Sequence, residues 1–162
     1  MKLDARVQAA IEIVAEVMAG AAADRALKAW GQTHRFAGSG DRRAIGDLVY
    51  AALRTGGGAA TPRAAILAVL AGQGLSPDGI AALFSGARHA PAPLSEAERA
   101  ALGEAAPALP DWLAASLARA WGGNAGAELA ALLARAPMDL RVNTLKATRE
   151  TALEKLAEDG IA

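Results

Sequence analysis

Apolar residues recur every three or four positions through much of the first hundred residues, and this spacing predicts helices with one buried side. In the first helix the apolar stripe consists of Val7, Ile11, Val14 and Met18. Asp4 is a suitable N-cap for this helix, because its carboxylate can accept the unpaired N–H groups of the first turn. The helix is expected to end near Gly20.

Two further amphipathic helices are predicted before residue 60. One is expected from Asp24, with Leu27 and Trp30 on one face. The other is expected from Asp41, after the Gly38–Gly40 break, and closes at Gly56–Gly58. Its apolar positions are Ile45, Leu48, Val49, Ala52 and Leu53. This pattern is typical of a helix packed against a core.

Several later helices are marked by capping signals. Thr61-Pro62 and Ser76-Pro77 each place a capping side chain before a proline at the first helical position, where its missing N–H costs nothing. Ser95 followed by Glu98 predicts a capping box.

Two more helices are expected before Pro137. One begins at Pro110-Asp111-Trp112 and runs toward Trp121. The next is capped by Asn124 and is expected to bury Leu129, Leu132 and Leu133.

After Pro137 the period changes to two, because Leu140, Val142 and Thr144 alternate with Arg141 and Asn143. This alternation predicts a strand. Thr148 is expected to cap a following helix that ends at Gly160. A single strand cannot satisfy its own backbone groups, so we expect the rest of its sheet to come from residues beyond Ala162.

These patterns predict a mainly α fold with two parts. Residues 1–136 are expected to form a helical bundle, and residues 137–162 the first β-α unit of a small α+β module that the chain does not complete. The composition agrees with a helical core, because 53% of residues are hydrophobic but only 4% are aromatic. Such a core must be built mainly from alanine and aliphatic side chains.

The sequence contains no candidate for catalysis. Zero cysteines exclude disulfides and thiolate chemistry. His34 and His89 have no neighbouring ligand at metal spacing, and the glycine runs lack the context of a phosphate-binding loop. Charges interrupt the N-terminal apolar run, which excludes a signal peptide, and no stretch has membrane-spanning length. A cytoplasmic protein is therefore expected.

Binding is the remaining class of function. Formal net charge is zero, yet residues 24–63 carry seven Lys or Arg against three Asp. Arg42 and Arg43 fall in the first turn of a predicted helix, where cations oppose the helix dipole. They could contact phosphate, or they could pair with Asp41 or Asp47 or simply be solvated.

A second basic group contains Arg141, Lys146 and Arg149. Arg141 and Asn143 would share one strand face, which suits RNA backbone and base edges, although solvated edge-strand residues would give the same pattern. Trp30, Trp112 and Trp121 lie in or near apolar helical stripes, so core packing is favoured over base stacking for all three.

Six segments together resemble the N-terminal region of bacterial RNA cytosine-C5 methyltransferases of the Sun (Fmu) family. The segments are Ala5-Arg6-Val7-Gln8-Ala9-Ala10-Ile11-Glu12-Ile13, Ala23-Asp24-Arg25-Ala26-Leu27, Arg35-Phe36-Ala37-Gly38-Ser39-Gly40-Asp41-Arg42-Arg43-Ala44-Ile45 through Leu53-Arg54, His89-Ala90-Pro91-Ala92-Pro93-Leu94, Leu109-Pro110-Asp111-Trp112-Leu113 and Leu140-Arg141-Val142-Asn143-Thr144-Leu145-Lys146-Ala147-Thr148-Arg149. They occur in family order along nearly the whole chain.

The resemblance implies a bundle similar to the transcription antitermination factor NusB, followed by the start of the module that precedes the methyltransferase domain. In the family, that later domain binds S-adenosylmethionine and carries two catalytic cysteines. This chain has neither, so no catalytic residue is expected here. The residues expected to bind RNA are Arg6, Arg42, Arg43, Arg141, Asn143 and Lys146.

Three hypotheses follow. The chain is a non-catalytic RNA-binding or positioning region of a ribosomal RNA cytosine-C5 methyltransferase, with RNA and the catalytic domain of the same protein as partners and no membrane contact. Alternatively, it is a stand-alone NusB-like adaptor acting through protein and RNA contacts. In the third hypothesis, the bundle only braces the enzyme.

Overall fold

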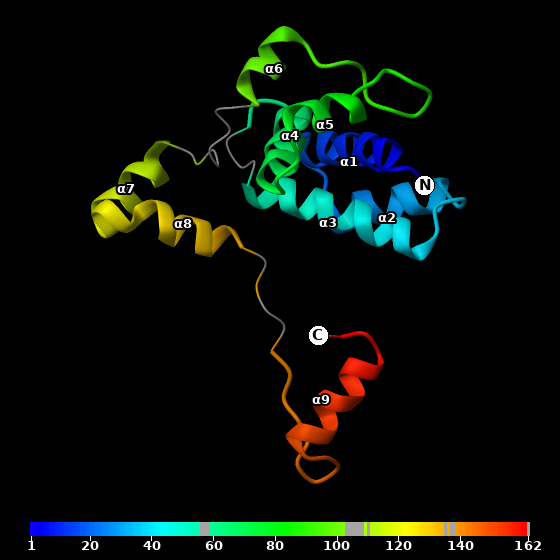
Figure 1. Ribbon diagram of the computed structural model, residues 1–162, viewed down its shortest axis with the longest axis vertical. Coiled ribbons are helices and arrows are strands. Elements are labelled where there is room, and N and C mark those ends of the chain that lie inside the picture. Colours follow the sequence, from blue (N-terminus) through cyan, green and yellow to red (C-terminus); the bar gives the residue numbers. More distant parts are fainter. Residues whose placement is uncertain (56–58, 103–108, 110, 135, 137–138, 162) are drawn as a thin grey trace.

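The computed structural model describes residues 1–162 apart from 56–58, 103–108, 110, 135, 137–138 and 162, and apart from the side chain of Asp111. The described residues are mainly helical and contain no strand (Figure 1). The helices are α1 (Leu3–Met18), α2 (Ala23–Thr33), α3 (Ser39–Thr55), α4 (Pro62–Gly72), α5 (Pro77–Leu83), α6 (Glu96–Ala101), α7 (Asp111–Trp121), the 3₁₀ turn η1 (Gly122–Asn124), α8 (Ala125–Leu133) and α9 (Arg149–Glu158).

The core is centred on α1, which packs against α2, α3, α4 and α5. In Figure 1, α1 lies between α4 and α5 on one side and α2 and α3 on the other. The largest fully buried side chains include Phe84, Ile13, Ile45, Ile66, Leu70 and Ile80. Every buried hydrophobic residue among the described ones lies between Val7 and Leu94. The bundle therefore has one aliphatic core, as the composition predicted.

The predicted capping signals of four helices are confirmed. The hydroxyls of Thr61 and Ser76 each accept a backbone N–H three residues later, with donor–acceptor distances of 3.1 Å. Ser95 and Glu98 form the complete capping box. Thr148 accepts the N–H of Thr151 at 3.2 Å and so caps α9. These signals act within four residues, which is why sequence alone predicts them.

Other predicted helix starts are wrong. α1 begins at Leu3 with Lys2 as its N-cap and no side-chain cap, and the Asp4 carboxylate accepts the N–H of Ala5 at 2.7 Å instead. α3 begins at Ser39, two residues before Asp41. Asn124 flanks α8, but the η1 turn gives it helical backbone angles, so its side chain makes no cap. The predicted end at Gly56–Gly58 lies outside the described residues.

The strand predicted around Leu140–Thr144 is wrong as well. This segment has no strand partner among the described residues, and a lone strand cannot satisfy its backbone groups. The chain instead turns at Asn143. Its side-chain oxygen accepts the N–H of Leu145 at 3.1 Å, and its carbonyl accepts that of Lys146 at 2.9 Å. Leu145 is left 95% exposed.

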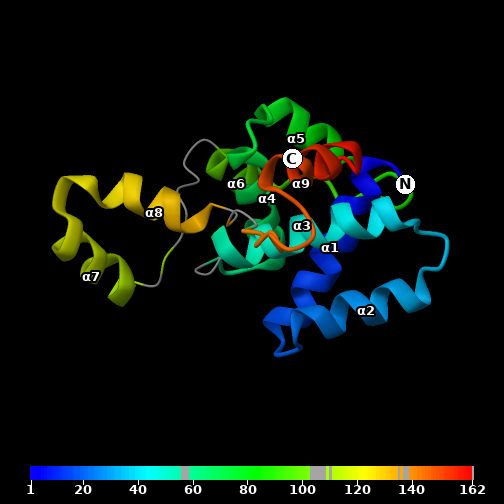
Figure 2. The same cartoon turned by 90° about the horizontal axis from the view of Figure 1, so that it is seen from below.

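The α7–α8 hairpin lies beside the bundle in both Figure 1 and Figure 2, and its two helices pack on each other through η1. The predicted burial of its leucines is wrong, because Leu129 and Leu133 are half-buried and Leu132 is 65% exposed. Trp112 is 72% exposed, whereas Trp30 is buried in the core as predicted. Trp121 is half-buried.

Arg63 of α4 holds the 85–94 loop and α6 against the bundle. Its Nε and Nη2 atoms lie 2.8 and 3.1 Å from the two carboxylate oxygens of Glu98. The same guanidinium donates to the carbonyls of Ala92 and Pro93 and lies 4.9 Å from the centroid of the Phe84 ring. A bidentate pair of this kind is stronger than an ordinary surface ion pair.

We expect Glu98→Gln to weaken this clamp in a pH-dependent way. The hydrogen bond from Arg63 lowers the pKa of Glu98 to about 2 from an ordinary value of 4.5. A pKa that is lower in the folded state stabilises the fold above pH 4.5, and this contribution disappears as the pH falls toward 2. Glutamine keeps the capping box but removes the charge.

Urea unfolding should therefore show Glu98→Gln less stable than the parent protein by ~1 kcal/mol at pH 7. The difference should shrink steadily between pH 4.5 and 3. A difference that stays constant with pH would contradict the ionic part of the clamp.

Candidate nucleic-acid interface

Asp41 joins the start of α3 to the start of α1. Its Oδ1 atom lies 2.7 Å from Nη2 of Arg6 and 3.1 Å from the terminal amine of Met1. Hydrogen bonds from the terminal amine and from Arg6 lower the pKa of the Asp41 carboxyl. The carboxylate also lies in the first turn of α3, where negative charge is favoured. Asp41 thus ties the first turn of α3 to the start of α1.

This arrangement gives Arg6 a structural partner. Its guanidinium is bound to Asp41 through both Nε and Nη2, and its side chain is 31% exposed. Among the described residues no ion pair joins Asp41 to Arg42, so that alternative from the sequence is not the one adopted. Whether Arg6 also contacts RNA stays a prediction.

A basic groove lies between α2 and the start of α3. It has a volume of about 550 Å³ and is lined by Leu27, Lys28, Gly31, Gln32, Arg35 and Arg42. Three of the lining residues are cations, and none is a carboxylate. All three cations are exposed. Such a groove can hold anionic groups of a flexible chain.

Gly31 positions Arg42 in the basic groove. The side chain of Arg42 lies over the glycine, with its Cδ and Nε atoms 3.7 Å from the place where a Cβ would stand. Gly31 is buried by this contact. The stem of Arg42 is thus packed along α2, as long basic side chains commonly are.

The other predicted RNA-binding residues do not line this groove. Arg43 is exposed on α3. Arg141 lines a groove of about 1000 Å³ in the C-terminal segment, with Leu140, Val142, Leu153, Leu156 and Ile161 among its neighbours. Asn143 forms the turn described above, and Lys146 is exposed. The structure thus separates the six residues into a bundle group and a C-terminal group.

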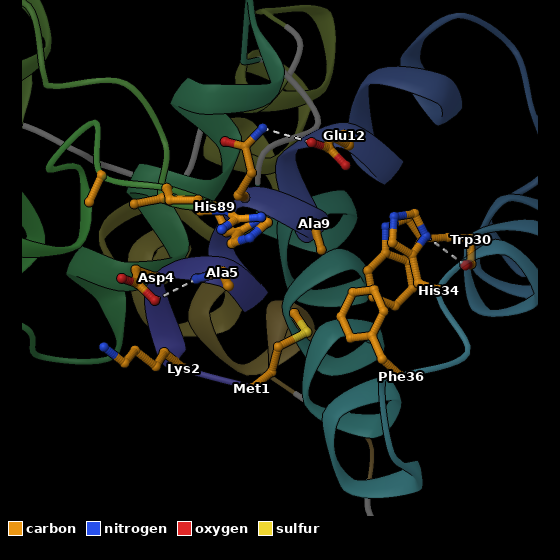
Figure 3. Close-up of a pocket in the computed structure, with 14 residues that line it drawn as sticks. Met1, Lys2, Asp4, Ala5, Ala9, Glu12, Trp30, His34, Phe36 and His89 are labelled. Atoms are coloured by element: carbon orange, nitrogen blue, oxygen red, sulfur yellow. Dashed lines mark hydrogen bonds between the residues drawn. The ribbon is translucent and has the colours of Figure 1, made fainter.

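A second groove, which we call the aromatic groove, also borders the end of α2. It has a volume of about 810 Å³, and its lining includes Ala5 and Ala9 of α1, Trp30, His34, Phe36 and His89. Figure 3 shows the three aromatic side chains together on one side and His89 on the other, beyond Ala9.

Trp30 and Phe36 each contact His34 through their rings. The rings of Trp30 and His34 are stacked, with centroids 4.3 Å apart and planes 7° from parallel. Nδ1 of His34 lies 2.9 Å from the carbonyl oxygen of Trp30. The same Nδ1 atom lies 3.0 Å from Oγ1 of Thr33. Phe36 meets His34 edge-on, with centroids 5.7 Å apart.

The far wall of the aromatic groove is the 85–90 loop. Gly86 donates its N–H to the Pro91 carbonyl at 2.9 Å. Gly86 has φ +70°, and a Cβ there would lie 2.9 Å from Cδ of Pro93, so glycine is required. His89 also has a positive φ of 69°. Since Arg63 binds the carbonyls of Ala92 and Pro93, the clamp supports this wall.

Sequence reasoning did not select Lys28, Arg35 and Phe36 as site residues, although they line the two grooves. A signal existed, because the run His34-Arg35-Phe36 joins two predicted helices and combines basic and aromatic residues. The sequence does not indicate which groove each of these residues lines, because that depends on how α2 packs against the bundle. Within the described ranges, no three His, Asp or Glu residues could hold a metal ion, and no helix could span a membrane.

Comparison with protein families gives one match. Residues 109–162, about a third of the chain, match the family described as Methyltr_RsmF/B-like, ferredoxin-like domain. This match relates the chain to RsmF/B-type methyltransferases and supports the resemblance to the Sun (Fmu) family. Searches of curated proteins and of solved structures gave no match. The boundary predicted at residue 136 stays a prediction, and the matched region includes α7 and α8.

We expect Asp41→Asn to destabilise the bundle at neutral pH, because it removes the charge that binds Arg6 and the terminal amine. The parent carboxyl has a lowered pKa, so its contribution is present above its ordinary pKa of 3.8 and is lost at lower pH. The melting temperature of the variant should be below that of the parent at pH 7, and the difference should shrink as the pH falls below 3.8.

Asp24→Asn is the matched control, since Asp24 is an exposed carboxylate in the first turn of α2. Asp24→Asn removes a charge that interacts with a helix dipole, without removing the ion pair with Arg6. Equal losses in both variants would show that Asp41 acts only through the dipole.

Proposed function

We propose that this chain is the non-catalytic N-terminal RNA-binding region of a ribosomal RNA cytosine-C5 methyltransferase. The observation that carries the proposal is the basic groove, where Lys28, Arg35 and Arg42 converge without a carboxylate. The family match of residues 109–162 supports the methyltransferase assignment. The resemblance of residues 5–54 to the Sun (Fmu) family supports a NusB-like identity for the bundle.

Electrostatics supports a role for the groove in binding a polyanion. The chain has a formal net charge of zero, so long-range attraction to RNA is weak. Affinity must then come from local contacts between cations and phosphates. Such contacts release counterions and make binding depend on salt.

The C-terminal group supplies a second contact in this proposal. Arg141, Asn143 and Lys146 lie within the segment matched to the ferredoxin-like domain. Leu140 and Leu153 are exposed beside them and line an apolar groove with α9. An apolar surface of this kind favours packing against further parts of the same protein, where the catalytic domain would be found.

S-adenosylmethionine is proposed as the cofactor of that catalytic domain, and the residues of this chain do not fit it. Adenosyl cofactors bind where a parallel strand leads through a glycine-rich turn into a helix. The described residues contain no strand. We therefore assign the cofactor no ligand here, and the chain's contribution is to bind and position RNA.

Replacing Lys28, Arg35 and Arg42 together by alanine should weaken RNA binding. Each phosphate contact to a single strand contributes about −0.7 to the slope of log affinity against log salt. The triple variant should therefore have a slope smaller in magnitude by about 2. Fluorescence anisotropy with a single-stranded RNA of about 12 nucleotides, over a range of salt concentrations, measures both quantities.

The control is Arg99→Ala, Arg119→Ala and Lys155→Ala in one chain, which removes the same charge from exposed positions elsewhere. It should leave the slope nearly unchanged. Equal effects in the two triple variants would show nonspecific attraction. No binding by the parent protein would favour the adaptor or the brace.

A double variant tests the proposed RNA contact of the C-terminal group. Arg141→Ala with Lys146→Ala should reduce the slope by about 1.4 in magnitude, for two phosphate contacts. The same anisotropy titration measures it. An unchanged slope would confine RNA binding to the bundle.

A further inference from the structure

Phe36 is an aromatic side chain that the fold leaves uncovered at the mouth of a groove. It is 76% exposed, and it stands in the short turn between α2 and α3. Exposing a large apolar ring to water is unfavourable. The ring contributes little to the core, so folding alone does not explain its place.

The neighbouring rings make the aromatic groove suitable for a planar ligand. Trp30 covers one face of His34, and the bond from Nδ1 to the Trp30 carbonyl fixes the imidazole plane. Phe36 stands at 74° to that plane. A volume of about 810 Å³ is in the range of small-molecule sites. A flat ring entering the groove can therefore stack on Phe36 without moving the other two.

The remaining lining offers both acceptors and donors, which suits the polar edge of a base. Asp4 and Glu12 stand on the α1 side of the groove, and Gln8 donates to Glu12 at 2.8 Å. Carboxylates repel phosphate but accept hydrogen bonds from the amino groups of bases. Lys2 at the chain start and Arg88 and His89 of the loop add donors.

The aromatic and basic grooves meet at consecutive residues. His34 and Phe36 line the aromatic groove, whereas Arg35 between them lines the basic groove. The turn between α2 and α3 therefore borders both grooves. Single-strand binding sites commonly combine a basic track with aromatic platforms in this way.

We infer that the aromatic groove binds an unpaired nucleobase of the RNA strand whose phosphates lie in the basic groove. This inference rests on the proposed function and specifies its ligand as single-stranded RNA. In a duplex the bases are stacked on each other and cannot enter the groove.

The test is Phe36→Ala, measured with two anionic probes. With a single-stranded RNA of about 12 nucleotides, the variant should bind roughly tenfold more weakly, because one base loses its stacking partner. Its salt slope should be unchanged, since no phosphate contact is removed. With inorganic polyphosphate, which has no bases, its affinity should equal that of the parent.

Two further variants control this test. Phe36→Trp should bind RNA as tightly as the parent, because it keeps a stacking surface. Trp112→Ala removes another exposed aromatic ring, on α7, and should change nothing. Melting temperatures should be nearly unaffected by Phe36→Ala, since the ring is mostly exposed.

The outcomes separate this inference from the proposed function. If Lys28, Arg35 and Arg42 are required for RNA binding but Phe36→Ala binds normally, the base site is overturned and the proposed function stands. If Phe36→Ala weakens polyphosphate binding equally, the ring acts through the basic groove and the base site is again overturned. If the parent binds no RNA, both fail.

Discussion

The ion cluster at Asp41 pairs Arg6 and leaves Arg42 to line the basic groove. One carboxylate binds Arg6 and the terminal amine, and so ties the first turn of α3 to the start of α1. Arg6 is thereby committed to a structural contact. Arg42, one residue after Asp41, follows a different path and lies along Gly31. The basic groove contains Arg42 and not Arg6, because Arg6 is paired with Asp41.

The chain differs in side-chain burial before and after Leu94. Before it, aliphatic side chains from α1, α3, α4 and α5 form a core that fixes both grooves. After it, no described residue is buried, and α9 carries an uncovered apolar side. The match to a ferredoxin-like domain falls in this second part. A strand there would need neighbouring strands, and without them the alternation of Leu140–Thr144 predicts nothing stable.

The sequence predicted what depends on nearby residues and missed what depends on distant ones. Thr61, Ser76, Ser95 and Thr148 cap their helices through contacts three residues long, and all four were predictable. The pairs Arg6–Asp41 and Arg63–Glu98 each join residues 35 positions apart. No local pattern indicates such pairs. The site was predictable only in part, because Arg42 stood out by its position against the helix dipole, whereas Lys28 and Arg35 did not.

In the proposed RNA-binding role, the two grooves would make different contributions to binding. Three cations give modest affinity that any polyanion would share. Selectivity must then come from a feature that other polyanions lack, and an exposed ring beside carboxylates is such a feature. The groove wall opposite that ring is held by the Arg63 clamp, which binds the backbone of the same loop. The Arg63 clamp thus supports the wall that the proposed base site would use.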